Sequence, residues 1–229
     1  MRVTPERERS PRGATIRWTH RPDRPRAVVL VLHGGREKGT QRTSGRQLAV
    51  LRVIPFAKAV ARRGGDDVAV MRLRYAVRGW NSDAGPVRDT QWALGHIAEQ
   101  YPDLPVGLMG YSMGGRAALR LAAEPQVRSV VTLAAWVDRR DITGWRVNPG
   151  LPVLLLHGRD DRVTSPAGSE LAAGRLTDLG ARVDLDVLPG DGHAMLRHAR
   201  HWHSRAADHL VDTLLDGNGH REPLAEGDG

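Results

Sequence analysis

The spacing of apolar residues along the chain predicts strands and helices in alternation. Five short runs are largely apolar, and such runs are typical of parallel strands that are buried on both faces. A sixth segment, 182–187, alternates polar and apolar residues, which predicts a strand near the sheet edge. Residues 14–18 fit a first, edge strand. The five buried runs span 27–32, 68–73, 106–109, 127–133 and 153–156.

The segments between these strands carry apolar residues at helical spacing. Pro55 lies inside the first of them, and a proline in a helix interior predicts a kink or a break. Gly64 and Gly65 follow that helix, and Gly180 follows the fourth, as helix-ending glycines do. The predicted helices span 47–63, 87–100, 116–123, 165–179 and approximately 200–215.

This alternation predicts an α/β fold, in which a mostly parallel central sheet carries helices on both faces. A single domain should cover residues 14–215, because 229 residues suit one α/β core. The charged segments 1–13 and 216–229 are predicted to be disordered tails. In such a sheet, ligands bind at the carboxyl ends of the strands.

Composition narrows the classes of function. The chain has no cysteine, which excludes a disulfide framework and a Cys-ligated metal site. The charged start has no apolar signal-peptide core, and no apolar run reaches the roughly 20 residues that span a bilayer. We therefore expect a cytoplasmic protein with no membrane partner. The sequence says nothing of the oligomeric state.

The net charge is +8, from 34 basic and 26 acidic residues. Only Lys38 and Lys58 are lysines, and the arginines are scattered over every segment. No basic helix is present, and no series of aromatic residues could stack on bases. The charge therefore indicates an arginine-rich solvated surface, and we expect no nucleic-acid partner.

The motif Gly110-Tyr111-Ser112-Met113-Gly114-Gly115 lies between a predicted buried strand and a predicted helix. A G-x-S-x-G motif in this position forms a sharp turn that presents its serine at the end of the strand. Small residues two positions before and after the serine fit the crowding of that turn. Ser112 is therefore a candidate nucleophile.

Two further strand ends carry residues that could serve this serine. His157-Gly158-Arg159-Asp160-Asp161 follows the strand at 153–156, and Gly192-His193 follows the last strand. His193 would take the proton of Ser112, and Asp161 would orient the imidazole, with Asp160 as the alternative acid. The backbone N–H groups of Met113 and of Gly35, or less favourably Arg36, would stabilise an oxyanion.

These motifs resemble the α/β-hydrolase superfamily, in particular its small members with little or no cap, such as the dienelactone hydrolases and bacterial serine esterases. The resemblance covers about residues 14–215 and rests on His33-Gly34-Gly35, on the segment 110–115, on His157-Gly158 with Asp161, and on Gly192-His193. It implies a serine hydrolase that needs neither a metal nor an organic cofactor. Dienelactone hydrolases usually have cysteine at the position of Ser112, which argues against that particular substrate.

We therefore expect a hydrolase that cleaves a small carboxylic ester through an acyl-serine intermediate. A thioesterase, peptidase, lactonase or perhydrolase would use the same residues, and a non-catalytic receptor or scaffold is the alternative from another class. Arg36, Trp80 and Trp136 are candidate pocket residues. His198, His201 and His203 form a histidine cluster, which we interpret as solvated or packed because no ligand partner stands at metal-binding spacing.

The predicted loop 134–152 is too short for a cap of several helices. We therefore expect Ser112 to lie open to solvent and short acyl chains to be preferred.

Overall fold

The computed structural model describes residues 8–216, which form an eight-stranded sheet with the strand order β1-β2-β4-β3-β5-β6-β7-β8. The strands from β4 to β8 in this order run parallel, and only β1 and β2 are antiparallel to their neighbours. The strands are β1 (Glu8–Arg9), β2 (Thr15–His20), β3 (Ala27–Leu32), β4 (Val68–Arg74), β5 (Val106–Tyr111), β6 (Val127–Leu133), β7 (Pro152–Gly158) and β8 (Arg182–Leu188).

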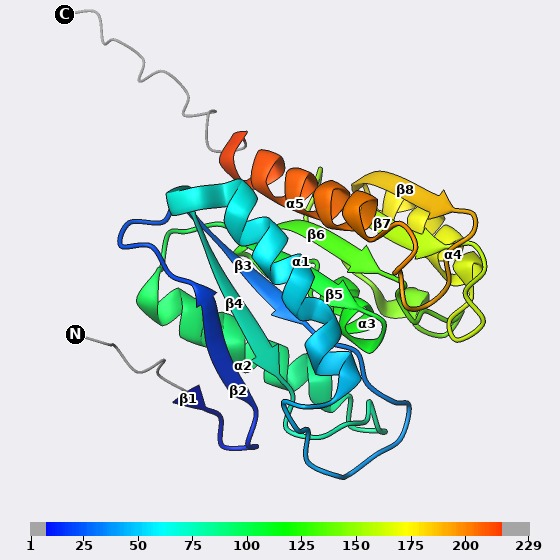
Figure 1. Cartoon of the computed structure of the whole chain (residues 1–229), viewed down its shortest axis with the longest axis horizontal. Coiled ribbons are helices and arrows are strands. Elements are labelled where there is room, and N and C mark those ends of the chain that lie inside the picture. Colours follow the sequence, from blue (N-terminus) through cyan, green and yellow to red (C-terminus); the bar gives the residue numbers. More distant parts are fainter. Residues whose placement is uncertain (1–7, 217–229) are drawn as a thin grey trace, which may run out of the picture.

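Helices cover both faces of this sheet (Figure 1). Helices α1 (Leu48–Gly64) and α5 (Ala199–Asp216) lie side by side on one face. Helices α2 (Gly85–Gln100), α3 (Met113–Arg120) and α4 (Pro166–Asp178) pack on the other. Two short 3₁₀ turns span Gly65–Asp67 and Ile142–Gly144. The predicted α/β fold with helices on both faces is thereby confirmed.

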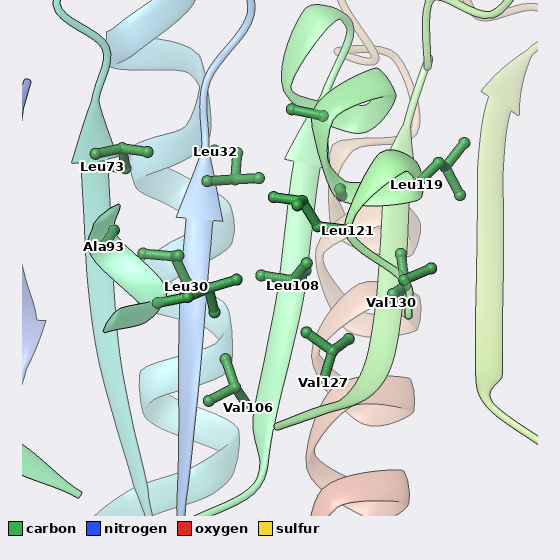
Figure 2. Packing of buried hydrophobic residues seen from close by; sticks show 14 of the residues in the cluster. Leu30, Leu32, Leu73, Ala93, Val106, Leu108, Leu119, Leu121, Val127 and Val130 are labelled. Atoms are coloured by element: carbon green, nitrogen blue, oxygen red, sulfur yellow. The ribbon is translucent and has the colours of Figure 1, made fainter. Parts of the chain in front are cut away.

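Each central strand contributes side chains to two separate apolar layers, because successive side chains of a strand point to opposite faces. Leu30 and Leu32 of β3 pack with Leu108 of β5 in the layer beneath α2 and α3 (Figure 2). Val29 and Val31 of the same strand lie beneath α1 and α5. This double burial explains why the central strands are apolar at nearly every position.

Three details differ from the sequence-based prediction. Residues Glu8 and Arg9, placed in a disordered tail, form β1 against β2, so β2 is not the edge strand. Arg12 binds Asp89 and Asp83 and holds this segment against the start of α2. Helix α1 runs through Pro55 without a break, since neighbouring side chains of the helix are buried against the sheet. The other predicted tail residues, 1–7 and 217–229, lie outside the described residues.

Within residues 8–216, no helix combines the length and the apolar character that crossing a bilayer requires.

Candidate active site

Ser112 occupies a strained turn between β5 and α3. Its backbone has φ 55° and ψ −115°, a conformation that residues other than glycine rarely adopt. A Cβ atom at Gly110 would lie 2.2 Å from the Gly114 carbonyl oxygen, and one at Gly114 would lie 2.5 Å from the Leu32 oxygen. Both glycines are therefore required by the close approach of β5, α3 and β3. The Ser112 N–H donates to the Leu133 oxygen over 2.8 Å.

Asp161 lies in the turn after β7, and its carboxylate is enclosed by hydrogen-bond donors. The N–H groups of Val163 and Thr164 donate to Oδ1 over 2.7 and 3.0 Å, and His157 Nε2 lies 3.1 Å from Oδ2. Burial alone would raise the pKa of Asp161, but the bonds from His157, His193, Thr164 and Val163 outweigh it and hold that pKa far below its usual range. Asp161 is therefore a fixed negative charge.

His193, in the loop after β8, binds this charge directly. Its Nδ1–H donates to Asp161 Oδ2 over 2.7 Å, which leaves Nε2 as the ring nitrogen with a free lone pair. Its ring lies 5.1 Å from that of Tyr111, the residue before Ser112. The adjacent Asp160 is exposed and its backbone N–H donates to the Asp191 oxygen. Of the two predicted acids, it is Asp161 that contacts the histidine.

The loop after β3 lies directly against the turn at Ser112. A Cβ atom at Gly34 would lie 3.3 Å from Ser112 Cβ, and one at Gly35 would lie 2.3 Å from Met113 Cε. The Arg36 N–H already donates to the Arg78 oxygen over 2.9 Å, which removes it as an oxyanion donor. Within residues 8–216, the N–H groups of Gly35 and Met113 have no acceptor. These two groups therefore remain available to a ligand.

Ser112 itself is 7% exposed, so the expectation that it lies open to solvent is wrong. Among residues 8–216 no helical cap covers it, since the only helical turn in 134–152 is Ile142–Gly144. The close packing of the loop after β3 and of the segment at 133–136 encloses it instead. Within the described residues no hydrogen bond joins its hydroxyl to His193, a contact that often tightens only when substrate binds.

The structure adds two residues that the sequence did not single out, Tyr111 and Arg52. The Tyr111 hydroxyl donates to the His193 carbonyl oxygen over 2.8 Å. Arg52 of α1 donates to the Ala194 oxygen over 2.7 Å, and its guanidinium carbon lies 5.7 Å from the centre of the Tyr111 ring. Together, Tyr111 and Arg52 hold the loop that carries His193 against β5. Only the position of Tyr111 inside the G-x-S-x-G motif could have pointed to it.

Trp80 and Trp136, predicted to line the pocket, enclose the side chain of Arg116. The guanidinium carbon lies 4.4 Å from the centre of the Trp80 ring and 4.2 Å from that of Trp136. Arg116 also donates to Asp141 over 2.6 and 2.8 Å. The backbone N–H of Trp136 donates to the backbone oxygen of Ser112, so the side chains of Trp80, Arg116 and Trp136 lie close to the turn at Ser112.

A cavity of about 310 Å³ opens beside the loop after β3. Gly35 and the third predicted pocket residue, Arg36, line it, together with Leu48 at the start of α1. Trp80 and Trp136 are not among its lining residues. A larger cavity of about 830 Å³ lies at the opposite end of the strands, where β5, β6 and β7 begin. Neither cavity is lined by Ser112, Asp161 or His193.

The histidines at 198, 201 and 203 have separate partners. His201 Nε2 lies 2.8 Å from Asp186, His203 packs edge-on against Phe56, and His198 Nδ1 lies 3.6 Å from Asp191. In the part of the chain that the structure describes, no three such side chains are placed to hold a metal ion together.

In this mostly parallel sheet, a serine on a strained turn, a buried aspartate and a histidine all follow the carboxyl ends of strands. This arrangement defines an α/β hydrolase. The chain belongs to the dienelactone hydrolase family, whose model matches residues 21–215. None of the curated proteins matches it.

Several solved structures share the fold at low sequence identity. A serine hydrolase without a lid from Xanthomonas campestris is 17% identical with a TM-score of 0.70, over 92% of this chain and 94% of that one. A thermophilic esterase from Thermogutta terrifontis, with propionate bound, is 17% identical with a TM-score of 0.69, over 96% and 97%. An α/β hydrolase from a Medee basin deep-sea metagenome library is 16% identical with a TM-score of 0.69, over 93% and 98%.

Proposed function

We propose that this protein hydrolyses small carboxylic esters through an acyl-serine intermediate on Ser112. The observation that carries the proposal is the contact between the buried Asp161 and His193, 2.7 Å apart, at the same end of the strands as the strained Ser112. Asp161 fixes the tautomer of His193 that leaves Nε2 able to accept a proton. A serine hydroxyl needs such a base to become a nucleophile at neutral pH.

The proposed reaction has two halves. His193 Nε2 takes the Ser112 proton as Oγ attacks the ester carbonyl carbon, and the N–H groups of Gly35 and Met113 stabilise the oxyanion. The tetrahedral intermediate collapses, the C–O bond to the alcohol breaks, and His193 returns the proton to the departing alkoxide. A water molecule, deprotonated by His193, then attacks the acyl carbon of the acyl-enzyme. The bond from that carbon to Ser112 Oγ breaks, His193 returns the proton to Oγ, and the carboxylic acid is released.

The cavity beside Gly35 adjoins one of the proposed oxyanion N–H groups, and its size favours a small substrate, although Ser112 and His193 do not line it. Its volume of about 310 Å³ lies at the lower end of the range for small-molecule sites. The Thermogutta terrifontis esterase, which shares the fold, has been solved with propionate and with butyrate bound. Thioester, lactone, peptide and perhydrolase chemistry would use the same proposed groups, so a substrate panel has to separate them.

The first test is Ser112→Ala, assayed with p-nitrophenyl acetate. Because the substitution removes one oxygen atom, the fold should survive while turnover falls about 10⁴-fold. Ser204→Ala, at an exposed serine of α5, is the matched control and should keep full activity. Residual turnover above about 1% in Ser112→Ala would contradict the assignment.

A fluorophosphonate probe gives an independent test, because it labels only an activated serine. The folded protein should be labelled at Ser112 and the Ser112→Ala variant should not. Failure of the folded wild-type chain to react would favour the alternative, a receptor or scaffold built on this fold.

A further inference from the structure

A second concave site lies at the outer part of the sheet, between helix α1 and the pair of strands β2 and β4. Strand β2 lies on the outer side of β4, beside the region that α1 covers (Figure 1). The groove has a volume of about 210 Å³. Its lining includes three arginines on the strands, Arg17, Arg72 and Arg74, and three apolar residues of α1, Val50, Leu51 and Ile54.

The register of the two strands brings arginines face to face. In the antiparallel pair, Arg17 stands directly opposite Arg72, and Arg74 follows two positions further on the same face. The alternate residues Ile16 and Leu73 point to the other face and are buried in the core there. Like charges directly opposite one another destabilise a strand pair, so this arrangement costs stability unless something compensates it.

No acidic side chain of β2, β4 or α1 compensates the charges of Arg17 and Arg72. Strand β1, which pairs with β2, carries Glu8, but Glu8 stands opposite Ile16 and its carboxylate contacts His96. Strands β2 and β4 and helix α1 contain neither aspartate nor glutamate. Burial lowers the pKa of Arg72, and the nearby charge of Arg17 lowers it further. Within residues 8–216, no ion pair includes Arg17 or Arg72, whereas Arg63 and Arg116 each bind aspartates.

One hydrogen bond orients the half-buried arginine. Arg72 Nε donates to the Thr19 hydroxyl over 2.7 Å, which ties one edge of the guanidinium to β2. A guanidinium presents donors in a planar fork that matches phosphate or carboxylate oxygens. Next to Arg17 and Arg72, Leu51 of α1 is 42% exposed and provides an apolar wall of the groove. The groove therefore combines a site for an anion with a surface for an apolar group.

We propose that this groove is a binding site for a small, free amphiphilic anion, a phosphate or carboxylate on a short apolar chain. The head group lies between Arg17 and Arg72, and the chain packs against Leu51 and its neighbours on α1. The anion relieves the repulsion between the two guanidinium groups. This site contains neither Ser112, Asp161 nor His193 and takes no part in the proposed hydrolysis.

Hexyl phosphate is the probe, titrated calorimetrically into the full chain carrying Ser112→Ala, so that hydrolysis cannot contribute. We expect saturable binding at one site, at least tenfold tighter than that of inorganic phosphate or hexanol. Arg17→Gln should weaken binding at least tenfold, while Arg24→Gln, at an exposed arginine outside the groove, should not change it. Leu51→Ser should weaken binding, and Leu185→Ser, at a comparably exposed leucine of β8 outside both this groove and the cavity beside Gly35, should not.

Thermal unfolding keeps the test informative if a variant is altered in stability. Without ligand, Arg17→Gln should melt at the same or a higher temperature than the parent, since one of two opposed charges is gone. Hexyl phosphate should raise the melting temperature of the parent and leave that of Arg17→Gln unchanged. A lower melting temperature of ligand-free Arg17→Gln would show that Arg17 has a structural partner and would overturn the proposal.

Three other outcomes would also overturn it. One is equal binding of hexyl phosphate by the parent and Arg17→Gln. The second is inorganic phosphate binding as tightly as hexyl phosphate, which would leave the apolar wall without a role. The third is binding to vesicles of phosphatidylcholine with phosphatidylglycerol but not to hexyl phosphate, which would make the surface a membrane contact. None of these results depends on whether Ser112 is a nucleophile.

Discussion

Asp161 and Asp160 are neighbours in sequence with opposite environments. The side chain of Asp161 is fully buried and contacts His193 and His157, whereas Asp160 is exposed. The difference comes from the turn after β7, in which the N–H groups of Val163 and Thr164 both point at Asp161 Oδ1. A single turn thus decides which of two identical residues faces the histidine.

Asp161→Asn should therefore reduce kcat/KM about 10⁴-fold, because an amide holds the wrong tautomer of His193. Asp160→Asn should change kcat/KM by less than about threefold. Steady-state kinetics on p-nitrophenyl acetate would compare the two variants. Equal losses, or a larger loss in Asp160→Asn, would assign the acid to Asp160.

His33 is a buried base whose titration should destabilise the protein in acid. Burial, with help from the charge of Arg74, lowers the pKa of His33 to about 4 from 6.5, although its bond to the Gly34 oxygen opposes the shift. The Tyr75 N–H donates to His33 Nε2, so a proton added there breaks that bond. Below pH 6.5 the unfolded chain binds a proton at this residue that the folded chain does not bind until near pH 4.

The free energy of unfolding should accordingly fall by about 3 kcal/mol between pH 6.5 and pH 4 on account of His33. His33→Gln keeps an acceptor for the Tyr75 N–H but cannot titrate, so its stability should fall less over this range. Urea unfolding at several pH values measures both slopes. His203 and His209, whose pKa values are also lowered by burial, are present in both proteins and cancel. Parallel slopes would contradict the role of His33.

The residues that the sequence identified are those whose spacing in the chain carries the signal. Ser112 is marked by its flanking glycines, and His193 and Asp161 by their places after predicted strands. Tyr111 and Arg52 were missed because their roles depend on contacts between α1, β5 and the loop after β8, which no local pattern encodes. Ser112 was expected to be more exposed because the packing of the loop after β3 cannot be read from composition.

At the scale of elements, one buried ion pair joins helix α3 to the loop 134–152. Arg116 and Asp141 lie 2.6 Å apart with side chains 10% and 1% exposed, and Arg120 shares the same carboxylate at 3.1 Å. The two residues are far apart in sequence and follow no periodic pattern, so the sequence could predict the helix and the loop but not their connection. The pair also fixes the two tryptophans that flank Arg116.

Arg116→Met should destabilise the protein by about 3 kcal/mol, since it leaves the buried Asp141 with only a partly exposed partner. Arg120→Met is the matched control, because its side chain is 38% exposed and its pairing should contribute about 1 kcal/mol or less. Urea unfolding of both variants measures the difference. Equal losses would mean that burial does not distinguish the two arginines.

At the scale of the whole molecule, the alternation of strands and helices predicted a mostly parallel sheet with helices on both faces, but not the order of its strands. The order β2-β4-β3-β5 places β4 and β5 on opposite sides of β3, and no local pattern in the sequence encodes that reversal. The short strand β1 was not predicted, because two residues with charged side chains carry no strand pattern. Its pairing with β2 exists only because β2 leaves an edge free.

The absence of a multi-helix cap over 134–152 should make the enzyme selective for short acyl chains. Burying one CH₂ group of an acyl chain contributes ~0.8 kcal/mol to binding, and a CH₂ group that contacts no apolar surface of the protein contributes none of it. A series of p-nitrophenyl esters from acetate to palmitate should peak at short chains, with no increase in rate when the substrate forms micelles. Peak rates on long chains would reveal a deeper channel than the cavity beside Gly35.

Strand β8 closes the sheet on the side away from β1, and its composition affects how separate molecules meet. Arg182 and Asp184 are exposed on this strand, and Asp186, on the same face as Asp184, is held by His201 from α5. A bare strand edge is a template for a strand of another chain, whereas charged side chains along it make such pairing unfavourable. These charges therefore make it unfavourable for a strand of a second molecule to extend the sheet at β8.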